Sequence, residues 1–184
     1  MEFWFWKRKY IMVKILNHMK IIFILCCLFS LLSCNKLCKD ENLSLKRISY
    51  TGKELKTDGY FYNHWKSDGS LSMNSTVIFF LYRNGIILSA GSVESTDLEI
   101  VEKEINKQYE FLYKKKIGYG VFIVENGKLL YEQWSTSAGG CLPVFKSSYT
   151  IENDSTLINP YGEIYHFRQF STKPDSIIAN KWIN

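Results

Sequence analysis

Residues 119–134 read YGVFIVENGKLLYEQW, and this stretch decides the fold class. Two apolar and aromatic runs flank Asn126-Gly127, the dipeptide most typical of a two-residue β-hairpin turn. A two-residue turn fixes the register, so the facing residues follow from the sequence alone. The pairs are Ile123/Leu130, Val121/Glu132 and Tyr119/Trp134 on one face, and Val124/Leu129, Phe122/Tyr131 and Gly120/Gln133 on the other. Both faces are largely apolar, which predicts a sheet covered on both sides.

Residues 76–90, TVIFFLYRNGIILSA, repeat the pattern around Asn84-Gly85. We therefore predict a second hairpin with the same two-residue turn. The expected pairs are Leu81/Leu88 and Phe79/Ala90 on one face, and Tyr82/Ile87 and Phe80/Ser89 on the other.

Further strands are expected at residues 60–62, 144–151, 156–158 and 163–170, which gives seven or eight antiparallel strands with short links. Residues 97–114 predict a helix, because apolar residues recur there at steps of three and four and Thr96 and Glu99 stand at capping-box spacing. We expect this helix to cover the outside of the sheet. The strand pattern fits a barrel or a sandwich.

The N-terminal region has the pattern of an export signal. Residues 21–32, IIFILCCLFSLL, follow Lys14, His18 and Lys20 and are too few for a membrane span, which takes about 20 residues. The following residues, Leu31-Leu32-Ser33-Cys34, resemble the lipobox of bacterial lipoproteins. In a lipobox the cysteine thiol receives diacylglycerol, and the signal peptide is cleaved off immediately before the cysteine. An ordinary signal peptide and a retained membrane helix are the alternatives, and Met12 and Met19 are alternative starts to Met1.

The lipobox divides the chain into three parts. We predict a lipoprotein signal peptide at residues 1–33, lipidation at Cys34, a polar tether at 34–44 and a barrel domain at 45–184. Two or more acyl chains, such as palmitate, hold a protein stably at a membrane, so the domain is expected beside a bilayer. The expected location is the cell envelope, at the outer membrane.

Three stretches carry a family resemblance. Residues 56–62 (KTDGYFY), 79–88 (FFLYRNGIIL) and 119–134 are similar to those of small lipoproteins of Bacteroidota with a lipocalin-like (calycin-like) barrel. The resemblance implies a mostly β fold, an antiparallel up-and-down barrel with one covering α-helix. The chain departs from lipocalins in two ways: the first strand has no Gly-x-Trp, and the helix lies in mid-chain. These motifs specify strands and turns, so they imply no particular chemistry.

Charge and cysteine content exclude some classes of function. Of 23 Lys and Arg and 18 Asp and Glu, residues 1–33 hold five basic residues and one acidic residue, which leaves 18 basic and 17 acidic residues. Such a balance argues against nucleic acid as a partner. Outside the cytoplasm, Cys38 and Cys141 could form a disulfide. The cysteines and histidines lack metal-site spacing, so no metal or other cofactor is expected.

Catalytic motifs are missing as well. The sequence has no GxSxG, HExxH, phosphate-binding glycine loop or nucleotide fingerprint, and His64 and His166 are interpreted as structural. We therefore expect a protein without enzymatic activity that binds a small apolar or amphipathic ligand or a partner protein. The alternatives are a structural or interaction module with a filled barrel, and a hydrolase with an unrecognised site.

The hairpin faces suggest where a ligand would bind. Tyr119, Glu132 and Trp134 share a face, and in a barrel lumen they would form an amphipathic pocket. On the outside of the barrel, the same residues would pack against the helix. The candidate ligand-binding set is Phe79, Leu81, Tyr119, Val121, Ile123, Glu132 and Trp134.

Overall fold

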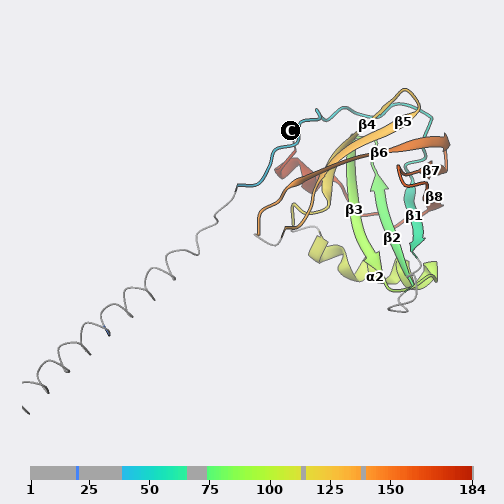
Figure 1. Cartoon of the computed structure of the whole chain (residues 1–184). Coiled ribbons are helices and arrows are strands. Elements are labelled where there is room, and N and C mark those ends of the chain that lie inside the picture. Colours follow the sequence, from blue (N-terminus) through green and yellow to red (C-terminus); the bar gives the residue numbers. More distant parts are fainter. Residues whose placement is uncertain (1–19, 21–38, 66–73, 113–114, 138–139, 184) are drawn as a thin grey trace, which may run out of the picture. The chain divides into compact units, whose positions relative to one another are not determined.

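The computed structural model describes residues 20, 39–65, 74–112, 115–137 and 140–183. Within this part of the chain, eight antiparallel strands form a closed barrel in chain order, with β8 returning to β1 (Figure 1). The strands are β1 (Gly59–Trp65), β2 (Ser75–Leu81), β3 (Ile86–Val93), β4 (Tyr119–Glu125), β5 (Lys128–Trp134), β6 (Val144–Asn153), β7 (Thr156–Ile158) and β8 (Ile164–Gln169). The fold class predicted from the sequence, an antiparallel up-and-down barrel with one α-helix, is confirmed.

The predicted register of the β4–β5 hairpin is confirmed. Val121 faces Glu132, Phe122 faces Tyr131 and Ile123 faces Leu130. Asn126 and Gly127 have φ values of 51° and 71°, as a type I′ turn requires at both central positions.

The predicted register of the β2–β3 hairpin is wrong by one residue. Leu81 pairs with Ile87 and Phe79 with Ser89, because the loop has three residues instead of two. The nitrogen of Tyr82 donates to the oxygen of Ile86 at 2.9 Å, and Gly85 has a φ of 79°. Such a loop is a turn followed by one left-handed glycine. This one-residue shift in register places Leu88 and Ala90 on the sheet face opposite to that of Leu81 and Phe79.

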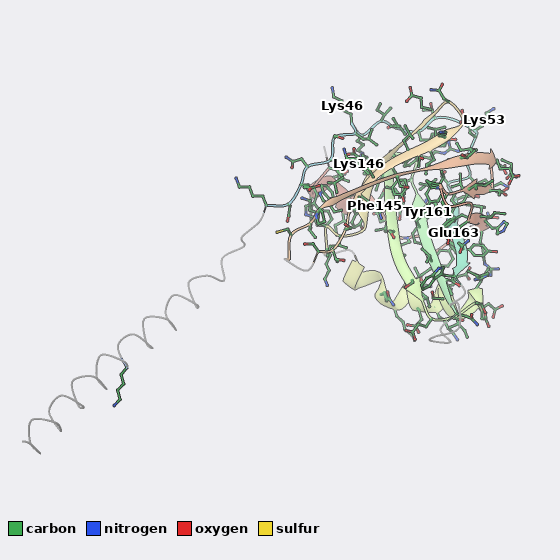
Figure 2. The ribbon with its side chains drawn as sticks, in the orientation of Figure 1. Lys46, Lys53, Phe145, Lys146, Tyr161 and Glu163 are labelled. Carbon is green, nitrogen blue, oxygen red and sulfur yellow. The ribbon has the colours of Figure 1, made fainter. Side chains whose placement is uncertain are left out.

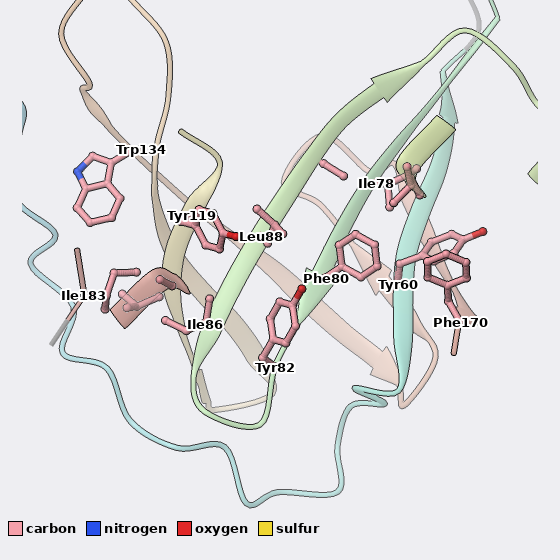
Figure 3. Close-up of a cluster of buried hydrophobic side chains, with 14 of the residues drawn as sticks. Tyr60, Ile78, Phe80, Tyr82, Ile86, Leu88, Tyr119, Trp134, Phe170 and Ile183 are labelled. Carbon is pink, nitrogen blue, oxygen red and sulfur yellow. The ribbon is translucent and has the colours of Figure 1, made fainter. Parts of the chain in front are cut away.

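The two faces of the sheet form two separate clusters. The inner cluster lies inside the barrel and takes residues from all eight strands and from residues 50–55; it contains Tyr50, Leu55, Phe61, Phe79, Leu81, Ile87, Phe122, Leu129, Tyr131, Tyr149, Leu157 and Tyr165. The outer cluster, shown in Figure 3, joins β1–β5 to helix α2 (Leu98–Leu112) and to the 3₁₀ helix η1 (Ile177–Lys181). Val101 and Ile105 of α2 and Ala179 of η1 are buried there. The expectation that this helix covers the outer face is confirmed.

Residues 40–58, which we call the strap, close one end of the barrel. Tyr50 donates its backbone N–H to the oxygen of Arg83 at 2.8 Å, and Lys56 donates to the oxygen of Asp154 at 3.0 Å. Both acceptors belong to turns at this closed end, which the strap crosses in Figure 1. Leu55 is buried in the inner cluster.

The strap overlaps the stretch expected to be a polar tether. The compact unit begins at Asp40, and Glu41 donates its backbone N–H to the oxygen of Leu142 at 3.0 Å. Residues 40–44 thus contact the barrel. Cys34 and the predicted signal, apart from Lys20, lie outside the described residues. In the described part of the chain, no helix has the length and apolarity needed to cross a membrane.

A candidate ligand site at the open end of the barrel

A pocket of about 220 Å³ opens at the end of the barrel opposite the closed end. Its walls come from β2, β3, β5, β6, β8 and the β7–β8 loop. The lining residues are Val77, Phe79, Ile87, Ser89, Tyr131, Gln133, Phe145, Ser147, Tyr149, Asn159, Pro160, Tyr161 and Tyr165. None of these described residues is charged. The pocket is smaller than the roughly 300–1,000 Å³ typical of sites for drug-sized ligands, so it fits a small molecule.

Three tyrosines, Tyr131, Tyr149 and Tyr165, contribute clustered hydroxyl groups to this pocket. The ring of Tyr149 stacks on that of Tyr131 at 5.6 Å between centroids and meets that of Tyr165 edge-on at 5.1 Å. Burial raises the pKa of all three hydroxyls, and the side chain of Tyr149 hydrogen-bonds to those of Tyr131 and Tyr165. The hydroxyls therefore stay neutral at physiological pH and offer both donors and acceptors.

Aromatic rings form the apolar part. Phe79 stacks on Tyr149 at 5.3 Å and on Phe61, deeper in the barrel, at 5.5 Å. Phe145 lies at the entrance, with its ring 6.1 Å from that of Tyr131. Ring faces beside uncharged hydroxyl and amide groups suit a compact amphipathic ligand that carries hydroxyl groups.

The loop at residues 159–163 holds Tyr161 at the entrance. The side-chain oxygen of Asn159 accepts hydrogen bonds from the backbone nitrogens of Tyr161 and Glu163, both at 2.9 Å. Its side-chain nitrogen donates to Glu163 Oε2 at 2.6 Å. Gly162, with a φ of 83°, allows the tight return to β8. Tyr161 is thus fixed by its backbone while the residue is 90% exposed. Tyr161 and Phe145, both labelled in Figure 2, line the same pocket.

The structure does not bring the predicted ligand-binding residues together. Phe79 and Leu81 lie in the inner cluster, whereas Tyr119, Val121 and Trp134 lie in the outer cluster with Val101 and Ile105 of α2. These three residues pack outside the barrel, which is the alternative that the sequence left open. Ile123 is half-buried and lines a groove beneath the strap.

Glu132 faces outward and binds the strap. Its Oε2 accepts hydrogen bonds from the backbone nitrogens of Ser44 at 2.5 Å and Leu45 at 3.0 Å, and Lys146 Nζ lies 2.8 Å from Oε1. Burial alone would raise the pKa of Glu132, but these bonds outweigh it and lower the pKa to about 2. The carboxylate of Glu132 is therefore ionised, and its role is to hold the strap on the outer face of the barrel.

The two histidines of the barrel domain lie away from the pocket. His64 and His166 are exposed and flank Tyr62 on the outside of the barrel, with ring centroids 5.2 and 6.1 Å from it. His64 Nδ1 lies 2.9 Å from Thr76 Oγ1. Among the described residues, no group of three or more His, Cys, Asp and Glu is placed to hold a metal ion.

Cys141 is disulfide-bonded. Its partner in the sequence hypothesis, Cys38, lies outside the described residues, so this pairing stays a prediction.

Comparison with known proteins adds no relative: no family model, curated protein or solved structure matches the chain. The class of protein therefore rests on the topology itself. The chain forms a closed eight-stranded antiparallel up-and-down β-barrel, which is compatible with a lipocalin-like fold and with ligand binding.

The candidate ligand-binding set does not contain the pocket tyrosines, because its residues of β4 and β5 come from the other face of the hairpin. The register of β4–β5 already put Tyr131 and Gln133 on the face opposite Trp134. Tyr149 of β6 is paired with Leu129, which lies on the same face as Tyr131, and Tyr165 of β8 is paired with Leu157 of the inner cluster. Both tyrosines therefore lie on this face. Following that face around the barrel, strand by strand, would have found them.

Proposed function

We propose that this chain is a lipid-anchored protein of the bacterial cell envelope that binds a small, uncharged, amphipathic ligand at the open end of its barrel and does not change it chemically. The observation that carries the binding part is the uncharged pocket of about 220 Å³. Its ring faces would contact the apolar side of a ligand, and its hydroxyl and amide groups would bind the polar side.

Sequence supports the anchoring part. Leu31-Leu32-Ser33-Cys34 follows a charged and then an apolar segment, as in lipoprotein signals. The resemblance to Bacteroidota envelope lipoproteins points the same way and favours the outer membrane. Acylation at Cys34 would keep the barrel near the source of its ligand and raise the effective concentration of both.

The polar groups of the pocket support binding without catalysis. The lining offers tyrosine and serine hydroxyls and the amides of Gln133 and Asn159. General acid–base catalysis needs a group that exchanges protons near the working pH, and burial moves the tyrosines further from it. A hydrolase is therefore the weaker alternative.

Native mass spectrometry of the protein purified from its own membranes tests both parts together. We expect the mass of a chain that starts at Cys34, increased by acyl chains, with a small ligand bound in addition. Cys34→Ser should abolish the acyl mass and release the protein from membranes. A wild-type mass without acyl chains would overturn the anchoring.

A filling substitution tests the pocket. Ser147 lines it, so Ser147→Leu should remove the co-purifying ligand and leave the far-UV circular dichroism unchanged. Ser148→Leu is the matched control, because the next residue of β6 points to the outer face, where it lines a different groove. Equal ligand occupancy in the two variants would overturn binding in this pocket.

The second candidate function is a barrel that serves as an interaction module. It is favoured by the dense inner cluster beneath the pocket, where Phe61, Phe79 and Phe167 are in ring contact. Under this alternative the purified protein carries no small molecule, and crosslinking in intact cells captures one envelope protein.

A further inference from the structure

We propose that the open end of the barrel rests on the lipid surface, so that the pocket opens toward the membrane. The contact would be made by the rim, defined here as Trp65, Phe145, Tyr161 and Ile164. This inference rests on the lipid anchoring proposed above and adds the orientation of the barrel and the surface that touches the bilayer.

The rim gathers exposed apolar side chains at one end of the molecule. Trp65 is the last residue of β1, Ile164 the first of β8 and Phe145 the second of β6, while Tyr161 lies in the β7–β8 loop. They are 57, 44, 49 and 90% exposed, and they account for four of the seven large hydrophobic side chains that are exposed in the described chain. Single exposed apolar residues are ordinary on soluble proteins, but a set confined to one end marks an interaction surface.

The residue types fit the boundary between water and lipid. Trp and Tyr are enriched at membrane interfaces, because their rings are apolar while their N–H or O–H groups stay hydrated. The closed end has a different character: Lys56 pairs with Asp154 there at 3.3 Å, and Lys53 lies on the strap at that end (Figure 2). The open end thus carries four of the seven exposed large hydrophobic side chains, whereas the closed end carries the Lys56–Asp154 ion pair beside Ile48 and Ile177.

The path of the chain points to the same end. Leu142 donates its backbone N–H to Asp40 Oδ1 at 3.2 Å, and Val144 donates to Glu41 Oε2 at 2.8 Å. Val144 is the first residue of β6 and precedes Phe145 of the rim. The first residues of the strap therefore contact the barrel beside the rim.

Chain length limits how far this entry point lies from the anchor. Asp40 follows Cys34 by six residues, which span at most about 20 Å when fully extended. An acyl anchor at Cys34 therefore holds the rim end within reach of the bilayer. A strand of seven residues adds about 23 Å to the closed end. Because the protein is already tethered, a weak affinity of the rim for lipid is enough to orient it.

Hydroxyl-radical footprinting on phosphatidylcholine vesicles tests the orientation. The acylated protein is bound to vesicles and compared with the Cys34→Ser protein free in solution. We expect oxidation of Trp65, Phe145 and Tyr161 to fall several-fold on vesicles. Ile48 and Ile177 are 61 and 66% exposed but lie at the closed end, because Ile48 is next to Gly85 and Ile177 follows Ser176, which is hydrogen-bonded to Asn84. Both should react at the same rate in the two samples.

Each outcome of that experiment is decisive. Vesicle flotation with unchanged oxidation of the rim would overturn this inference and leave the lipid anchor intact, as would protection of Ile48 and Ile177 in place of the rim. A wild-type protein that fails to float would overturn the anchoring, and this inference with it. The same footprinting is repeated in intact cells. Protection of the rim there but not on protein-free vesicles would assign the rim to a partner protein and overturn the lipid contact.

A double variant gives the independent check. Phe145→Ser with Tyr161→Ser should still float with vesicles, but Trp65 should return toward its oxidation rate in solution. Ile48→Ser with Ile177→Ser is the matched control and should keep the protection of Trp65. Circular dichroism shows whether both variants remain folded; equal protection of Trp65 in the two variants would overturn the role of the rim.

Discussion

The backbone nitrogen of Ser44 donates a hydrogen bond of 2.5 Å to Oε2 of Glu132, although the two residues are 88 positions apart. The hydroxyl of Ser44 donates to Oε1 of the same carboxylate, and Lys146 Nζ donates to that hydroxyl at 2.7 Å. The side chain of Glu132 is only 4% exposed. One buried carboxylate on β5 thus holds the strap against the outer face of the barrel.

Glu132→Gln should destabilise the protein at neutral pH. Hydrogen bonds to a charged group contribute about 1.5–3 kcal/mol, so we expect the free energy of unfolding at pH 7 to fall by about that amount. The folded pKa of about 2 lies below the ordinary value of 4.5. The carboxylate therefore stabilises the fold above pH 4.5, and this contribution is lost as the pH falls from 4.5 to 2.

Urea unfolding across this pH range measures the effect. The difference between wild type and Glu132→Gln should shrink steadily below pH 4.5. Glu152→Gln is the control, because Glu152 is exposed on β6 and should change stability little. A difference as large at pH 2.5 as at pH 7 would show that the charge of Glu132 is not what holds Ser44.

Two glycines test the position of the strap at the closed end. Gly85 and Gly127 both have a positive φ, so alanine at either position adds about 1–2 kcal/mol of backbone strain. A Cβ at Gly127 would meet no atom within 4 Å, whereas a Cβ at Gly85 would lie 2.2 Å from the oxygen of Ile48. Gly85→Ala should therefore lower the melting temperature clearly more than Gly127→Ala does. Equal losses would place Ile48 away from the turn.

These turns also show how far sequence could predict the fold. Asn126-Gly127 and Asn84-Gly85 are the same dipeptide, yet only Asn126 takes a positive φ. At the other turn the backbone oxygen of Asn84 accepts a hydrogen bond from Arg47 Nε at 2.9 Å, and its side-chain nitrogen donates to Ser176 Oγ at 2.8 Å. Local sequence predicts that a turn forms, but such distant partners influence which of two turn geometries is adopted.

The same limit explains why the residues of the candidate site were not identified from the sequence. Alternation along β5 predicts that Tyr131 and Trp134 face opposite sides, but it does not say which side is the interior. That depends on which face the helix, the strap and the 3₁₀ helix cover, and the cover comes from segments far from β5 in the chain. The strands and the helix were therefore predictable from the sequence. Which sheet face is the inner one could be known only from how these elements pack together.

The disulfide of Cys141 gives another prediction. Asp40 accepts a hydrogen bond from the nitrogen of Leu142, and two residues span at most about 7 Å, so Cys38 is within reach of Cys141. We expect non-reducing peptide mapping to find Cys38 linked to Cys141. Cys141→Ser should lower the free energy of unfolding by about 2–4 kcal/mol. A bond between Cys141 and Cys34 would contradict both this pairing and the acylation of Cys34.

Lys173 predicts a second pH dependence, at the alkaline side. Its Nζ donates to the backbone oxygens of Thr57, at 2.5 Å, and Leu81, and lies 3.9 Å from the centroid of Tyr82. Burial is the main cause that lowers the pKa of Lys173 from 10.5 to about 7; the charge of Arg83 adds to it, and Asp58 opposes it. Between pH 7 and 10.5 the unfolded chain thus binds more protons at this site than the folded chain does. Stability from this group rises with pH over that range and is lost as the pH falls through 7.

Lys173→Met removes this titration and keeps a similar volume. At pH 7 the variant loses the donor to two backbone oxygens but is also relieved of a buried charge, so the diagnostic quantity is how the stability difference changes with pH. Other lysines and tyrosines titrate at alkaline pH, so the readout is the difference between wild type and variant. This difference should grow from pH 7 to pH 10 in favour of the wild type, since the wild type alone gains stability from the buried amine. Lys128→Met, at the exposed turn of β4–β5, is the matched control for replacing a lysine with methionine. A constant difference between wild type and Lys173→Met would mean that Lys173 keeps an ordinary pKa in the folded barrel.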